Sequence, residues 1–187
     1  MISNPLQILQ TLDRHLTAPF TLYVYGRSAL ALGFADAPAD FHATMDVDAI
    51  LPARDLRALE ANEDFWLAQD RVNRELGDTG LYFTHLFEDR QVILTPDWLE
   101  QTVVLDKFDF TRLRLHRPST ADLVLTKLMR VDPQDRDDIR FLLKQPDMAP
   151  GQLDSALLVA RVPDVAEIRE AFRINCDWLQ TIRSYGK

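Results

Sequence analysis

YVYGRSALALG, residues 23–33, carries an apolar strand directly into a short helix. Ser28 is suited to cap the start of that helix, and Gly33 is suited to stop it. A turn from a strand into a helix offers unpaired backbone N–H groups and a hydroxyl, which together can hold a phosphate. Glycine allows the phosphate to approach the backbone closely, and arginine suits forked recognition of phosphate. We therefore expect Gly26, Arg27 and Ser28 to bind the phosphates of a nucleotide.

A second stretch, TMDVDAIL (residues 44–51), places two aspartates in a strand, where aspartate is uncommon. Strand side chains alternate, so Thr44, Asp46 and Asp48 share one face, and the two carboxylates lie ~7 Å apart along the backbone. Magnesium prefers hard oxygen ligands, usually one or two carboxylates together with the phosphates of the substrate. Asp46 and Asp48 are therefore predicted to bind Mg²⁺ and to act in catalysis.

Each of these two features also has an ordinary explanation. A Gly-x-Ser turn is most often only a turn with a helix cap, and two aspartates on one strand face usually face solvent. Their succession within about 25 residues is harder to explain in this way. A phosphate-binding turn beside a pair of metal-binding carboxylates is the arrangement that nucleotidyl transfer needs.

Composition limits the remaining classes of function. The 187 residues carry a net charge of −8, which does not suit a protein that binds along a nucleic-acid duplex. No apolar run approaches the ~18 residues of a membrane span, and the N-terminus lacks the features of a signal peptide. A single cysteine, Cys176, excludes an internal disulfide. We therefore expect a cytoplasmic protein without a membrane partner.

The periodicity of apolar residues predicts an α+β protein in which a small mixed β-sheet with helices is followed by a helical C-terminal segment. Strands are expected at 21–25, 45–51, 81–87, 91–95 and 111–115, with 81–87 and 91–95 forming a hairpin. Helices are expected at 2–16, 28–33, 53–76 (with a break near 62), 119–131, 137–144, 152–160 and 164–185. The predicted division is a core over 1–116 and a helical region over 117–187 that packs on it.

Together the two motifs, YGRSALALG and TMDVDAIL, resemble the signature of the nucleotidyltransferase superfamily (polymerase beta-like). They are most similar to its minimal bacterial branch, which includes toxins of abortive-infection toxin–antitoxin pairs and several uncharacterised nucleotidyltransferase-like domain families. A later stretch, DLVLTKLMRVDPQDRDDIRFLL (122–143), resembles the downstream helical motif of the same branch. Lys127, Asp135 and Asp138 fall on the polar positions of that motif, so the resemblance covers about residues 20–145.

The resemblance implies transfer of a nucleoside monophosphate from an NTP to a hydroxyl of RNA, a protein or a small molecule. It also implies a toxin-type enzyme with an antitoxin or another partner protein. In this interpretation Lys127 contacts phosphate with help from Asp138, Asp135 belongs to the nucleotide site, and Thr44 orients the aspartate strand. The residues themselves allow another interpretation. Lys127 lies on the flank of an apolar stripe and could be an ordinary surface lysine, and the two aspartates could support the start of the next helix.

The sequence departs from the pattern of this branch at two points. His42 stands where the branch often has arginine, and no carboxylate occupies the later strand that commonly carries a third acid. Thr84 and His85 are the polar residues within that strand, and His85 could be a base by its ordinary pKa. These departures leave a second hypothesis open, in which the chain is a catalytically degenerate nucleotide-binding or protein-interaction scaffold of the same fold.

Overall fold

The computed structural model describes residues 3–185, except for the side chains of Thr84, His85 and Tyr185. The chain forms two compact units. The first unit runs to Glu88 and resumes over Thr102–Pro118, and the second contains Asp89–Gln101 and the chain from Ser119 onward.

The first unit contains a mixed sheet in the strand order β3-β2-β1-β5-β4. Its strands are β1 (Phe20–Tyr25), β2 (Asp46–Leu51), β3 (Tyr82–Glu88), β4 (Val103–Val104) and β5 (Leu113–Arg117). β1 pairs with β2 and β4 pairs with β5 in antiparallel fashion, whereas the pairs β1–β5 and β2–β3 are parallel. This arrangement confirms the expected α+β core with a small mixed sheet.

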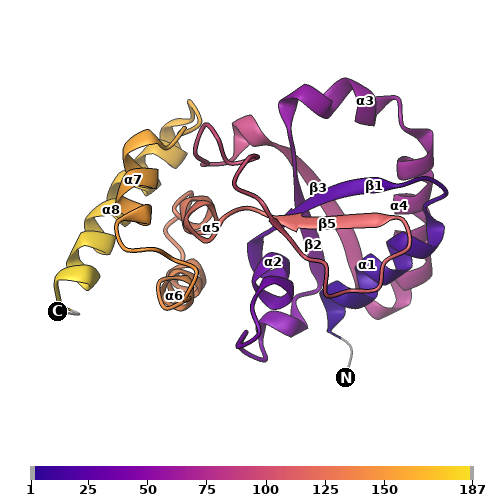
Figure 1. Ribbon diagram of the computed structural model, residues 1–187, viewed down its shortest axis with the longest axis horizontal. Coiled ribbons are helices and arrows are strands. Elements are labelled where there is room, and N and C mark those ends of the chain that lie inside the picture. Colours follow the sequence, from indigo (N-terminus) through magenta and orange to yellow (C-terminus); the bar gives the residue numbers. More distant parts are fainter. Residues whose placement is uncertain (1–2, 186–187) are drawn as a thin grey trace. The chain divides into compact units, whose positions relative to one another are not determined.

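Four α-helices belong to the first unit (Figure 1). They are α1 (Asn4–His15), α2 (Gly26–Gly33), α3 (Leu56–Glu60) and α4 (Glu63–Leu76). Two of them, α1 and α4, begin at a capping side chain, that of Ser3 and that of Asn62 respectively. The Asn62 side chain accepts a hydrogen bond from the backbone N–H of Phe65 at 3.0 Å, which caps α4 and confirms the break predicted near residue 62. The Phe65 ring contacts Phe20 and Phe83, so α4 covers the apolar face of the sheet.

The second unit is helical, with α5 (Thr120–Lys127), α6 (Pro133–Leu142), α7 (Gln152–Val159) and α8 (Ala166–Tyr185). Ser119 caps α5 and Asp132 caps α6 through their side chains. Asp122 is fully buried and accepts hydrogen bonds from the backbone N–H and the hydroxyl of Thr95. These bonds attach the segment 89–101 to α5.

The prediction of a strand at 91–95, and with it the hairpin of 81–87 and 91–95, is wrong. Residues 89–91 form a short 3-10 helix, and the following residues pair only through an isolated bridge between Leu94 and Arg161. The apolar side chains at 92–94 are nevertheless buried, because they belong to the helical unit and not to the sheet. The predicted chain division at 116/117 lies two residues before the boundary between the compact units at 118/119.

Within residues 3–185, no helix combines the length and the apolar character needed to cross a membrane.

Candidate functional site

The turn after β1 lies at the centre of the predicted phosphate site. α2 begins at Gly26, whose φ of +66° lets the chain turn directly from the strand into the helix. Ser28 is therefore not the helix cap that the sequence predicted, because the helix starts two residues earlier. Its buried hydroxyl donates to the carbonyl of Tyr25 at 2.9 Å. The first backbone N–H groups of such a helix have no partner within the helix and can bind an anion.

Arg27 points toward the loop that follows α2. Its Nη1 lies 3.1 Å from Oδ2 of Asp40, and its guanidinium lies 4.9 Å from the centre of the Phe41 ring. Both contacts hold the guanidinium against the loop of residues 40–41. A phosphate bound by Arg27 would therefore compete with Asp40 for the positive charge of the guanidinium.

Asp48 lies beside the Gly26 turn. It pairs with Tyr25 across the antiparallel β1–β2 ladder, and its Oδ2 is 3.8 Å from the point that a Cβ on Gly26 would occupy. The glycine is thus required by its positive φ and not by a lack of space. The expected proximity of one carboxylate to the turn is present.

Asp46 is half-buried at the start of β2. Its Oδ1 accepts a hydrogen bond from the Thr44 hydroxyl at 3.0 Å, which agrees with the expected orienting role of Thr44. The next residue on the strand, Val47, is fully buried on the face that α4 covers. Asp46 and Asp48 therefore share the opposite face of the strand, as their spacing predicted.

The residues of the second predicted motif meet in the helical unit. The Nζ atom of Lys127 lies 3.0 Å from Oδ1 of Asp135 and 2.7 Å from Oδ2 of Asp138. Arg130 also hydrogen-bonds to Asp135. Asn175 on α8 donates to the backbone carbonyls of Leu128 and Arg130, which fixes the end of α5.

This ionic cluster is buried, contrary to the surface position expected for Lys127. Lys127 is 7% exposed and Asp138 is 0% exposed, because α5 is buried on all sides and α6 packs against it. Burial alone would raise the pKa of Asp135, but hydrogen bonds from Arg130 and the charge of Lys127 outweigh it and hold that pKa below its usual value. Each buried charge thus has a partner of opposite sign, as buried ions require.

Comparison with protein families identifies the chain. Residues 7–185 match the model of a family described as a nucleotidyltransferase of unknown function (DUF6036). The chain belongs to this family. No curated protein and no solved structure matches it in the corresponding comparisons.

The strand next to the aspartates, β3, is the one that commonly carries a third acid in the branch that the sequence resembles. The register between β2 and β3 shifts between Val47 and Ala49, so Asp48 lies opposite Thr84 and His85. The proposal that His85 acts as a base concerns a side chain outside the described residues. Glu88 pairs with Leu51, on the other face from the aspartates. Among the described residues, no group of three or more His, Cys, Asp or Glu side chains could hold a metal ion.

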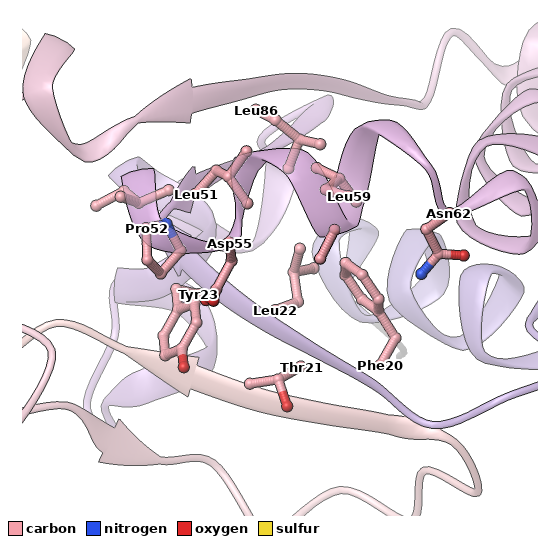
Figure 2. A pocket seen from close by; sticks show the side chains of 12 residues that line it. Phe20, Thr21, Leu22, Tyr23, Leu51, Pro52, Asp55, Leu59, Asn62 and Leu86 are labelled. Carbon is pink, nitrogen blue, oxygen red and sulfur yellow. The ribbon is translucent and has the colours of Figure 1, made fainter.

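A pocket of about 260 Å³ lies beside β1, the end of β2 and the segment 52–62 (Figure 2). Figure 2 shows Tyr23 and Asp55 close together at one end and Asn62 at the other. Burial, and then the charge of Asp55, raise the pKa of Tyr23. None of the predicted phosphate or metal residues lines the pocket. The lining residues nearest to them in the chain are Tyr23 on β1 and Ile50 on β2.

Sequence reasoning missed two residues beside the predicted motifs, Tyr82 next to Asp46 and Arg117 next to Gly33. Tyr82 on β3 pairs with Asp46 and is 42% exposed. Arg117 on β5 is buried against Gly33 at the end of α2. Neither could be found without knowing which strands are neighbours, because Asp46 and Tyr82 are separated by α3 and α4 in the chain.

Proposed function

We propose that this member of the nucleotidyltransferase family is a magnesium-dependent enzyme that transfers a nucleoside monophosphate from an NTP to a hydroxyl acceptor. The observation that carries the proposal is the position of Asp48 beside the Gly26 turn, with Asp46 on the same strand face. A carboxylate pair beside the start of a helix brings groups suited to metal binding and to phosphate binding together.

Magnesium fits the donor set of this site. Asp46 and Asp48 supply carboxylate oxygens from one strand face, and the Thr44 hydroxyl orients the first of them. Two carboxylates leave coordination positions for phosphate oxygens and water, which is the usual way in which proteins hold this ion. When bound, the metal neutralises the charge that develops on the transferred phosphate.

The residues have separate roles in the proposed reaction. The turn at Gly26 and Ser28 holds the terminal phosphates through backbone N–H groups. Asp46 and Asp48 would hold the magnesium ion, whose charge would offset their repulsion of the α-phosphate. The acceptor oxygen forms a bond to the α-phosphorus, the bond to the bridging oxygen breaks, and pyrophosphate leaves. The proton of the acceptor hydroxyl passes to solvent. Catalysis then rests on positioning and electrostatics, as is usual for phosphoryl-type transfer.

Lys127 could bind a phosphate only if its ion pairs with Asp135 and Asp138 were broken. Its ammonium would reach a phosphate after leaving Asp135 and Asp138, and its departure would leave two buried carboxylates less well paired. We therefore assign the cluster of Lys127, Asp135 and Asp138 primarily to the stability of the helical unit. A role in nucleotide binding remains the second part of the proposal.

The proposal also covers the acceptor of the nucleotide and the partners of the protein. RNA, a protein and a small molecule all carry suitable hydroxyls, and the toxin-type branch suggests an antitoxin as a partner. The net charge of −8 favours an acceptor that does not depend on many phosphate contacts. A cytoplasmic location would suit a donor that is a free nucleotide.

The alternative function is a nucleotide-binding or protein-interaction scaffold without catalysis. Two observations favour it. In the described part of the chain, no group of three or more His, Cys, Asp or Glu side chains could hold a metal ion, and the charge of Arg27 is already balanced by Asp40. A scaffold would retain the fold and would not release pyrophosphate.

Calorimetric titration with magnesium and a non-hydrolysable NTP tests the proposal. We expect Asp46→Asn to weaken binding at least tenfold, since a lost charged interaction is worth more than ~1.4 kcal/mol. Asp70→Asn, on the exposed surface of α4, is the control and should bind like the parent. Unchanged affinity in Asp46→Asn would refute the metal site. Binding without pyrophosphate release, measured over a panel of acceptors, would favour the scaffold.

A further inference from the structure

Tyr82 is the residue next to Asp46 on the neighbouring strand. The two are register partners in the parallel pair β2–β3, where neighbouring strands lie ~4.8 Å apart. The following pair, Val47 and Phe83, is fully buried on the face that α4 covers. Because side chains alternate along a strand, Asp46 and Tyr82 project from the opposite face together.

A second tyrosine lies beside the other aspartate, but its environment differs. Tyr25 is the register partner of Asp48, and its ring packs edge-on against Phe87 with 5.7 Å between the ring centres. Tyr82 is 42% exposed. The carboxylate pair therefore has a packed aromatic ring next to Asp48 and an accessible one next to Asp46.

The backbone that carries Tyr82 is firmly held. Its N–H donates to the carbonyl of Met45 at 3.1 Å. The Asn73 side chain binds both backbone groups of Phe83, at 2.7 Å to its N–H and 3.1 Å to its carbonyl. An exposed ring on a fixed strand is a preorganised surface, so a ligand that covers it does not have to order the backbone.

We propose that Tyr82 is a stacking residue for a nucleobase at the carboxylate site. This inference rests on the proposed nucleotidyl transfer and deepens it. Every nucleobase presents a π-face, and stacking on an aromatic side chain needs the ring and not a hydroxyl. Two sources supply such a base: the donor nucleotide and the terminal nucleotide of an RNA acceptor.

Binding measurements on a small set of variants test the inference. Tyr82→Ala removes the ring, Tyr82→Phe removes only the hydroxyl, and Leu67→Ala is a control at an exposed apolar residue of α4. Each protein is titrated with magnesium plus a non-hydrolysable NTP, magnesium plus tripolyphosphate, and a short single-stranded RNA. Thermal melts confirm that the variants are folded.

The expected result is a loss confined to ligands with a base. Tyr82→Ala should weaken binding of the NTP or of the RNA by roughly 5- to 150-fold, while tripolyphosphate binding stays unchanged. Loss with the NTP identifies the donor base, and loss with the RNA alone identifies the acceptor base. Tyr82→Phe and Leu67→Ala should match the parent.

Three results would overturn the inference. Parent-like binding of both base-containing ligands by Tyr82→Ala would remove the stacking role, and an equal loss in Tyr82→Phe would assign the effect to the hydroxyl. In both cases tripolyphosphate binding that depends on Asp46 would leave the proposed function intact. A parent protein that binds neither tripolyphosphate nor NTP would refute the proposed function and this inference together.

Discussion

Gly33 ends α2 directly against Arg117, and this contact explains why a glycine occurs there. A Cβ at residue 33 would lie 2.6 Å from Cδ and 2.8 Å from Nε of Arg117. The arginine has little room to move, because it is 3% exposed, its guanidinium lies over the Phe34 ring, and it donates to the carbonyl of Pro118. The sequence suggested a helix stop at this residue, whereas the structure adds a steric requirement.

We therefore expect Gly33→Ala to destabilise the protein by about 1–3 kcal/mol, the usual cost of overpacking a buried contact. Chemical denaturation followed by circular dichroism measures this change. Gly77→Ala is the matched control, because no atom outside its neighbouring chain segment lies within 4 Å of the added methyl group. A loss of stability in Gly77→Ala as large as that in Gly33→Ala would show that steric contact with Arg117 is not the cause.

At the scale of elements, α5 and α6 are joined by charges as well as by apolar packing. Lys127→Met keeps most of the side-chain volume but leaves the buried carboxylates of Asp135 and Asp138 without their shared cation. Breaking a buried ion pair by removing one partner typically costs about 3–5 kcal/mol. We expect a loss of this size in the free energy of unfolding.

Lys144→Met is the control for this substitution, since Lys144 is exposed near the end of α6. It should change stability by less than about 0.5 kcal/mol. If Lys127→Met unfolds like the parent, then the cluster contributes little to stability, and a functional role for Lys127 gains weight.

Asp135 makes the helical unit sensitive to low pH. The pKa of Asp135 is lower in the folded chain than in the unfolded chain, so the unfolded state binds more protons between these two values. The stabilisation is fully present above the unfolded pKa of about 3.9 and is lost as the pH falls through the folded pKa. Denaturation curves recorded between pH 6 and pH 2.5 should show this loss. In Asp135→Asn the decline should be smaller, and an identical decline would contradict the assignment.

Elements with local signals could be predicted from the sequence. The strand at 20–25 alternates apolar with more polar side chains and is followed by Gly26. The strand at 46–51 alternates only as far as Ala49, ends in an apolar run and is followed by Pro52. These local signals indicate both strands, and the alternation at 46–49 predicts the shared face of Asp46 and Asp48. The long-range partners could not be predicted. The resemblance grouped Lys127, Asp135 and Asp138 in one motif, but no local pattern indicates that they form a buried ionic cluster. No local pattern indicates either that Tyr82 lies beside Asp46.

At the scale of the whole molecule, the segment 89–101 shows how burial and strand formation differ. Its apolar run satisfies the pattern of a strand, but an apolar run of this length is also consistent with other buried structure. The segment packs in the helical unit through the hydrogen bonds of Thr95 to Asp122 and the bridge of Leu94 to Arg161. Contacts with residues 27 and 67 positions later in the chain, respectively, decide its conformation.

This assignment predicts how the chain responds to truncation. A chain that ends at Pro118 loses Asp122 and Arg161, so the buried side chains of Val92, Ile93 and Leu94 and the ring of Trp98 become exposed. Exposed apolar surface of this kind promotes association. We expect the truncated chain to aggregate, to bind a hydrophobic dye and to show red-shifted tryptophan fluorescence.

The matched control replaces residues 89–101 of the truncated chain by a Gly/Ser segment of equal length. This change removes the exposed apolar side chains and leaves all five strands of the sheet in place. The control chain should remain monomeric in size-exclusion chromatography and keep its strand signal in circular dichroism. If it aggregates as strongly as the simple truncation, then the first unit depends on α5–α8 for its own core, and the assignment of residues 89–101 to the helical unit does not explain the behaviour.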